Sequence, residues 1–120
     1  DPLLFTVTAG GRLMYTAAEQ YDYTFPDGGP VDAFYYRGAR AAAALARTWF
    51  DAVKADYAVR DAEAAERTEE ALDYIATAFP TPDAPAEPVL HPGDFNAMAY
   101  VISTMGERLL PAEVDDEDGG

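Results

Sequence analysis

Residues 3–17 read LLFTVTAGGRLMYTA, with two apolar runs on either side of Gly10-Gly11. The runs at 3–9 and 12–17 are rich in apolar and β-branched side chains, which are favoured in strands. A glycine pair between two such runs is typical of a hairpin, because the tight primed turns need residues that tolerate positive φ. We therefore expect an antiparallel β-hairpin at this position.

The segment that follows extends the same expectation. Residues 21–25 read YDYTF, in which aromatic and polar side chains alternate. Alternation with a period of two is the pattern of a half-buried strand. These residues could add a third strand and turn the hairpin into a meander, which PDGGP at 26–30 would end.

A helix is predicted from Asp32 to Lys54. Asp32 is a plausible N-cap, and alanine, the best helix former, dominates the run. At roughly 100° per residue, one side collects the candidate core residues Phe34, Leu45, Trp49, Ala52 and Val53. The other side carries four basic residues: Arg37, Arg40, Arg47 and Lys54. These can pair with a neighbouring acidic helix, remain solvated, or bind an acidic partner.

A second helix is expected from about Asp61 to Phe79. Its apolar stripe consists of Ala58, Ala65, Leu72, Ile75, Ala76 and Phe79, opposite the acidic side chains Glu63, Glu66, Glu70 and Asp73. The sequence leaves open whether residues 32–79 form one helix or two. Pro80 and Pro82 end the helix in either case.

A third helix is predicted at 94–109, after a proline-rich connector at 81–92. Asp94 is the expected N-cap, and the stripe is Phe95, Met98, Ile102, Met105 and Leu109. Residues 111–120 are expected to form a flexible acidic tail. The predicted fold is therefore a single α+β domain at 1–110, in which a hairpin or three-stranded meander packs against two or three helices.

The charge of the chain restricts its partners. There are 22 acidic and 8 basic residues, and the net charge is −14; residues 61–120 carry −13 of this. Such a chain should be repelled by nucleic acid and by anionic membranes, and no apolar run approaches the ~20 residues of a membrane span. A single lysine and an acidic surface are typical of proteins adapted to high salt. This favours the cytoplasm of a halophile, or a virus-like assembly, over secretion.

Residues with catalytic or metal-binding patterns are scarce. The chain has no cysteine and one histidine, so a zinc or copper site would have to rest on carboxylates. Phosphate-binding glycine motifs are absent. His91 lies in the proline-rich connector and is expected to be a surface residue. We predict no catalytic, cofactor-binding or metal-binding residue, and we favour a protein that is not an enzyme.

The function predicted from these observations is protein–protein interaction or assembly, with a protein partner or self-association. Aromatic side chains gather near the basic stripe, and tyrosine is favoured both at core edges and in interfaces. The candidate partner-binding residues are Tyr21, Tyr23, Phe25, Tyr35, Tyr36, Arg37, Arg40 and Arg47. Two alternatives remain open: an acidic mimic of nucleic acid that inhibits a DNA-binding protein, and a small enzyme whose carboxylates meet only in the fold.

Overall fold

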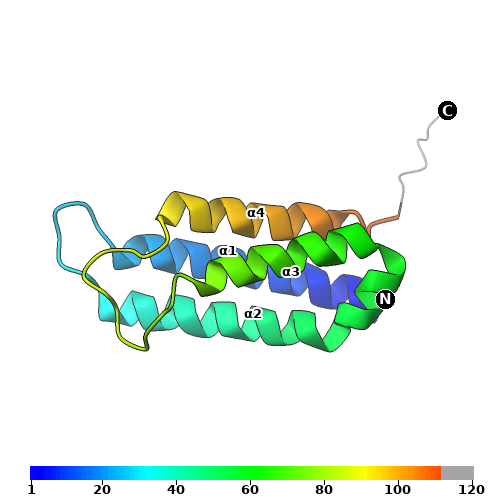
Figure 1. The fold of residues 1–120 in the computed structure, drawn as a ribbon, viewed down its shortest axis with the longest axis horizontal. Coiled ribbons are helices and arrows are strands. Elements are labelled where there is room, and N and C mark those ends of the chain that lie inside the picture. Colours follow the sequence, from blue (N-terminus) through cyan, green and yellow to red (C-terminus); the bar gives the residue numbers. More distant parts are fainter. Residues whose placement is uncertain (112–120) are drawn as a thin grey trace.

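The computed structural model describes residues 1–111, and all regular structure in this range is helical (Figure 1). The helices are α1 (Pro2–Thr24), α2 (Ala33–Arg60), α3 (Ala62–Ala76) and α4 (Pro92–Glu107). No strand is present in this part of the chain, so the α+β prediction is wrong. The tail predicted at 111–120 lies outside the described residues, apart from Pro111.

The segment predicted to be a hairpin is the first half of α1. Asp1 is the N-cap, and its carboxylate accepts hydrogen bonds from the backbone N–H groups of Leu3 and Leu4. Pro2 stands at the first helical position, where its missing N–H costs nothing. The buried positions of α1 recur every three to four residues and include Leu3, Val7, Gly11, Met14, Ala17, Ala18 and Tyr21. That period is helical, and burial of this face outweighs the strand preference of the individual residues.

The segment predicted to be a third strand is the end of the same helix. Tyr21 and Thr24 are buried and Phe25 packs against the core, whereas Asp22 and Tyr23 are exposed. Residues 21, 24 and 25 have the three- and four-residue spacing of a helix, but within five residues this spacing resembles the alternation of a strand. YDYTF alone therefore could not distinguish a strand from a helix. The chain turns just beyond it, at Gly28, whose φ is +70°.

Residues 32–79 form two helices. Asp32 caps α2 as predicted, accepting hydrogen bonds from Phe34 N and Tyr35 N. The single residue Asp61, with φ −160° and ψ 88°, ends α2, and its side chain caps α3 by accepting from Ala64 N. One extended residue is therefore enough to reverse the chain.

The last helix starts earlier than predicted. Its N-cap is His91 rather than Asp94, with His91 Nδ1 accepting a hydrogen bond from Gly93 N at 2.9 Å. Pro92 takes the first helical position, which suits its fixed φ. The predicted stripe is confirmed: Phe95, Ile102 and Leu109 are buried, and Met98 and Met105 are partly buried against them.

The helices alternate in direction, so each runs antiparallel to the next (Figure 1). α1 packs against α2 and α4, and α3 packs against the same two helices, while the diagonal pairs do not approach. The α1–α2 contact is the most extensive and the α2–α3 contact the least. Alanines at 39, 43 and 46 of α2 are buried in the core, and small side chains let neighbouring helices approach closely.

The two ends of the bundle are closed by different chemistry. At the end where α1 passes to α2, Phe79 lies within aromatic contact distance of Tyr21, Tyr36 and Phe95. At the opposite end, the Arg108 guanidinium contacts the carboxylates of Asp61 and Glu63 at 2.9 and 3.1 Å. One end is therefore held by rings that are buried or, for Phe79, half-buried, and the other by exposed ion pairs.

Candidate protein-binding surfaces

Three of the aromatic residues predicted to bind a partner belong to the core. Tyr21 and Tyr36 are fully buried, and Phe25 is partly buried beside Tyr21. The hydroxyls of Tyr21 and Tyr36 donate to the carbonyl oxygens of Leu90 and Thr81, at 2.6 and 2.7 Å. These two tyrosines thus attach the 77–91 connector to α1 and α2. Burial also raises the pKa of the Tyr21 hydroxyl.

Tyr23 and Tyr35 are the accessible members of the predicted aromatic set. Tyr23 is 51% exposed, and its ring lies 5.3 Å from that of Tyr35. Phe34, 70% exposed, adds a third ring 5.6 Å from Tyr35. The predicted cluster is therefore divided between the core and a small exposed aromatic patch where α1 ends and α2 begins.

The basic stripe of α2 is divided as well. Arg47 forms ion pairs with Asp51, Glu69 and Asp73, and Lys54 pairs with Glu69. The hydrogen bond to Asp73 raises the pKa of the Arg47 guanidinium. Arg37 and Arg40 are exposed and form no ion pair within residues 1–111. Pairing with the acidic helix therefore accounts for the second half of the stripe and leaves the first half available.

A groove of about 810 Å³ runs between α2 and α3 beside these arginines. Its lining includes the buried side chains of Met14, Ala43, Leu72 and Ile75 and the half-buried ring of Phe79. Its borders carry Arg37, Arg40 and Arg47 from α2, and Asp73 and Asp83 from α3 and the connector. The groove lies along the α2–α3 contact, which is the least extensive contact between helices. It combines an apolar floor with two cations, Arg37 and Arg40, that are unpaired in the described residues.

The stripe of α2 predicted to be core is largely exposed. Phe34 is 70% and Leu45 is 45% exposed, and Ala52 is exposed as well. The buried residues of α2 are instead Tyr36, Ala39, Ala43, Ala46, Phe50 and Tyr57. The prediction failed because alanine populates every side of this helix. The core could therefore form on the face where small residues admit neighbouring helices, leaving larger apolar residues outside.

This outward side, here called the outer face of α2, runs along the whole helix. It consists of seven exposed residues: Phe34, Ala41, Leu45, Thr48, Ala52, Ala55 and Val59. From Ala41 to Val59 they are spaced alternately by four and three residues, and none is charged. A seam with this spacing is the pattern of a helix that packs against another along its length.

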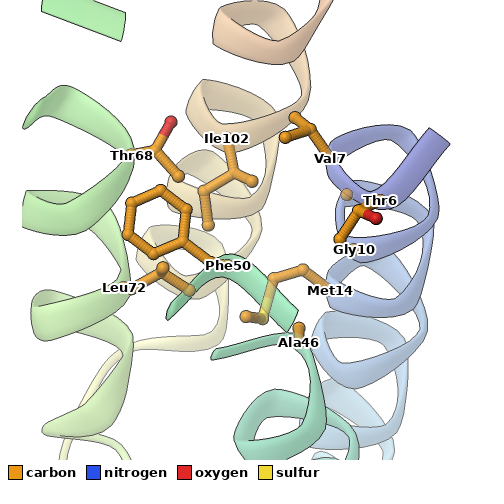
Figure 2. A pocket seen from close by; sticks show the side chains of 10 residues that line it. Thr6, Val7, Gly10, Met14, Ala46, Phe50, Thr68, Leu72 and Ile102 are labelled. Carbon is orange, nitrogen blue, oxygen red and sulfur yellow. The ribbon is translucent and has the colours of Figure 1, made fainter. Parts of the chain in front are cut away.

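The interior offers no room for a ligand in the region drawn in Figure 2. All four helices line a cavity of about 20 Å³, where Met14, Phe50, Leu72 and Ile102 point toward one another (Figure 2). That volume is near the minimum for one water molecule. Burial raises the pKa of Tyr57, and the nearby Thr68 hydroxyl partly offsets this shift, although the two hydroxyls do not reach full hydrogen-bond geometry.

The acidic side chains do not assemble into a site in the described range. None of them is buried, and the half-buried carboxylates of Asp32 and Asp61 are occupied as helix caps. Residues 1–111 contain no group of three or more histidine, aspartate or glutamate side chains placed to hold a metal ion. His91, the single histidine, serves as the N-cap of α4.

These features define the described part of the chain as an antiparallel four-helix bundle with an uncharged outer face on α2 and a groove beside it. No family model, curated protein or solved structure matches the chain. Within residues 1–111, no helix has both the length and the apolar character needed to cross a membrane.

Proposed function

We propose that this protein is a non-enzymatic interaction or assembly protein, adapted to high salt, that associates through the outer face of α2. One observation carries the proposal. In a chain with a net charge of −14, seven exposed residues along one side of α2, from Phe34 to Val59, carry no charge, and the single exposed cation on that side is Arg37, between Phe34 and Ala41. Exposed apolar patches of this kind mark sites of protein association.

The partner that fits this face is a second copy of the same chain. Two α2 helices packed antiparallel about a point between residues 46 and 47 would place Phe34 opposite Val59 of the other copy. In the same register Ala41 meets Ala52 and Leu45 meets Thr48, so the two largest side chains of the face, Phe34 and Leu45, do not meet each other and each faces a smaller one. Such a face is complementary to itself, as a two-fold symmetric dimer requires. The helix has 28 residues, or about 42 Å, which accommodates the three to four heptads expected of a helix-pairing seam.

Salt should strengthen this association. Two copies, each with a charge of −14, repel one another. The repulsion is screened to a Debye length of about 3 Å in 1 M salt, whereas the uncharged seam loses nothing by screening. A dimer that tightens as salt is added therefore distinguishes this seam from one held by ion pairs.

Sedimentation velocity at low and high sodium chloride tests the proposal. We expect a dimer whose fraction rises with protein and with salt, and Leu45→Glu should shift it to monomer. Leu110→Glu is the matched control, because Leu110 is 54% exposed and lies outside α2. A wild-type chain that stays monomeric in concentrated salt, or equal effects of the two substitutions, would contradict self-association through this face.

The alternatives are less well supported. A mimic of nucleic acid needs free, regularly spaced carboxylates, but Glu63 and Asp73 of the acidic side of α3 are paired with Arg108 and Arg47. A carboxylate enzyme needs two acids converging in a pocket, and every acidic side chain in residues 1–111 is at least partly exposed. Protein association therefore accounts for more of the described surface.

A further inference from the structure

We propose that the groove between α2 and α3 is a second binding site, which takes an amphipathic helix from another protein with its acidic flank toward α2. This site is distinct from the outer face of α2, although Ala41 borders both. Its occupant is inferred from three properties of the groove: an apolar floor, small residues along the walls, and cations on one border only.

The floor excludes most polar ligands. The apolar surface that a ligand can reach in the groove comes from its alanines and from the half-buried ring of Phe79, because Met14, Leu72 and Ile75 are almost fully buried. An extended peptide on such a floor would leave its backbone N–H and C=O groups without partners, which is costly. A helix satisfies those groups internally and can place one apolar stripe on the floor, as in other helix-in-groove complexes.

The walls allow a helix to come close. Ala41, Ala44 and Ala76 line the groove and are exposed, so no long side chain projects from these positions. The groove volume of about 810 Å³ is enough for a row of leucine-sized side chains. The partner's stripe should therefore carry large apolar residues at positions i, i+3 or i+4, and i+7.

The charges fix the orientation of the occupant. Arg37 and Arg40 stand on the α2 border with no carboxylate within ion-pair distance in residues 1–111, whereas Arg47 is already paired. Asp83, on the opposite border, has no ion pair among the described residues either. A partner helix with glutamates along only one flank of its apolar stripe matches both borders, whereas one that is acidic on both flanks meets Asp83.

A synthetic peptide tests this inference directly. The probe is a fluorescein-labelled amphipathic helix with a leucine stripe, glutamates on one flank and glutamines on the other. We expect saturable binding by fluorescence anisotropy at about 0.1 M salt, where charges are still felt. The same peptide with lysines in place of glutamates should bind at least tenfold more weakly. A peptide with glutamines in place of the leucines should not bind.

Protein variants locate the site. Arg37→Glu combined with Arg40→Glu should weaken binding of the glutamate peptide about tenfold, because two attractions become two repulsions. Arg12→Glu combined with Arg67→Glu is the matched control, since both arginines are exposed, unpaired in the described residues and absent from the groove lining. Equal losses in both variants would show that the peptide senses only net charge and would overturn the inference.

Two further measurements separate other occupants. Deleting residues 112–120, which contain five acidic side chains, should tighten the glutamate peptide slightly and weaken the lysine peptide slightly, because net negative charge is lost. Tighter binding of both peptides would identify the chain's own terminus as the occupant and refute an external helix. Displacement of the peptide by dodecanoate at similar concentration would point to a small amphipathic anion and would also refute it. Leu45→Glu should not change peptide affinity, so failure of self-association and failure of this site are distinguishable.

Discussion

The hydroxyl of Tyr21 and the backbone of Leu90 exchange two hydrogen bonds across 69 positions of sequence. Tyr21 Oη donates to the carbonyl oxygen of Leu90 at 2.6 Å and accepts from its N–H at 3.3 Å. Both residues are buried. A side chain of α1 thus satisfies the backbone of the connector just before α4 begins, where no helix or sheet is available to do so.

Replacing Tyr21 by phenylalanine should therefore destabilise the protein. The ring would remain, but the N–H and C=O of Leu90 would be left buried without partners, at a cost of about 1–3 kcal/mol. Urea denaturation measures the loss. Tyr100→Phe serves as the control, because Tyr100 is 61% exposed and makes no side-chain hydrogen bond in the described residues. Equal stabilities of the two variants would contradict the role assigned to Tyr21.

Stability should decline in alkaline solution. Burial raises the pKa of Tyr21 and of Tyr57 in the folded chain, whereas tyrosine in the unfolded chain ionises near pH 10. The stabilisation that these two phenols give the folded chain is therefore fully present below about pH 10, and it is lost as the pH rises through their folded pKa. Urea denaturation at about pH 8 and pH 11 measures how steeply the free energy of unfolding falls with pH. Tyr57→Phe should make this fall less steep, and an unchanged slope would exclude Tyr57 as a source of the pH dependence.

Two glycines of the α1–α4 interface should respond in opposite directions to alanine. A Cβ at Gly106 would lie 2.8 Å from Val7 Cγ1, which is closer than atoms tolerate. A Cβ at Gly11 would lie 3.7 Å from Ser103 Cα, an ordinary contact. We expect Gly106→Ala to cost about 1–3 kcal/mol. We expect Gly11→Ala to be neutral, or to stabilise by up to about 1 kcal/mol through helix propensity.

Thermal or urea denaturation of both variants checks this pair. Adding Val7→Ala to Gly106→Ala removes the atom that clashes and should recover part of the loss, although Val7→Ala alone leaves a cavity. If the double variant is as unstable as the sum of the single changes, the steric explanation is wrong, because residues in contact should couple.

His91 should be replaceable by another capping residue and not by alanine. Its Nδ1 accepts the hydrogen bond of Gly93 N at the start of α4, so His91→Ala should cost about 0.5–2 kcal/mol. His91→Asp keeps an acceptor and adds a negative charge near the helix N-terminus, which is favourable. Urea denaturation compares the free energies of unfolding of the two variants. If His91→Ala is as stable as the wild type, the cap contributes little to stability.

The later part of the fold was predictable because its helices begin and end with clear signals. Asp32 caps α2, and prolines follow the end of α3, as expected from sequence. The α4 stripe was identified because bulky residues at three- and four-residue spacing stand among polar ones. These are local properties of the chain, which sequence patterns report directly.

The first helix was not predictable by the same means. Gly10-Gly11 within a run rich in β-branched residues favours a turn on local grounds, and only packing against α4 makes Gly11 an interface residue. A correct signal was present in Asp1-Pro2, which is a helix N-cap followed by proline at the first position. It precedes the glycine pair and is independent of it.

The residues of the candidate binding surfaces could be named from sequence, but their arrangement could not. Sequence identified the arginines and tyrosines but not their division between core, ion pairs and solvent, because that division depends on which side of α2 faces its neighbours. Tyr36 and Tyr35 are adjacent in sequence, yet Tyr36 is fully buried and Tyr35 only partly so. The groove depends on the separation of α2 from α3, which no pattern within one helix encodes.

The unlike closures of the two ends mean that the solvent selects where the molecule first opens. Salting-out electrolytes act on the two ends in opposite directions, because they screen the exposed pairs of Arg108 with Asp61 and Glu63 and strengthen apolar burial around Phe79. The Arg108 end therefore loses support, and the Phe79 end gains it, as the surroundings become saltier.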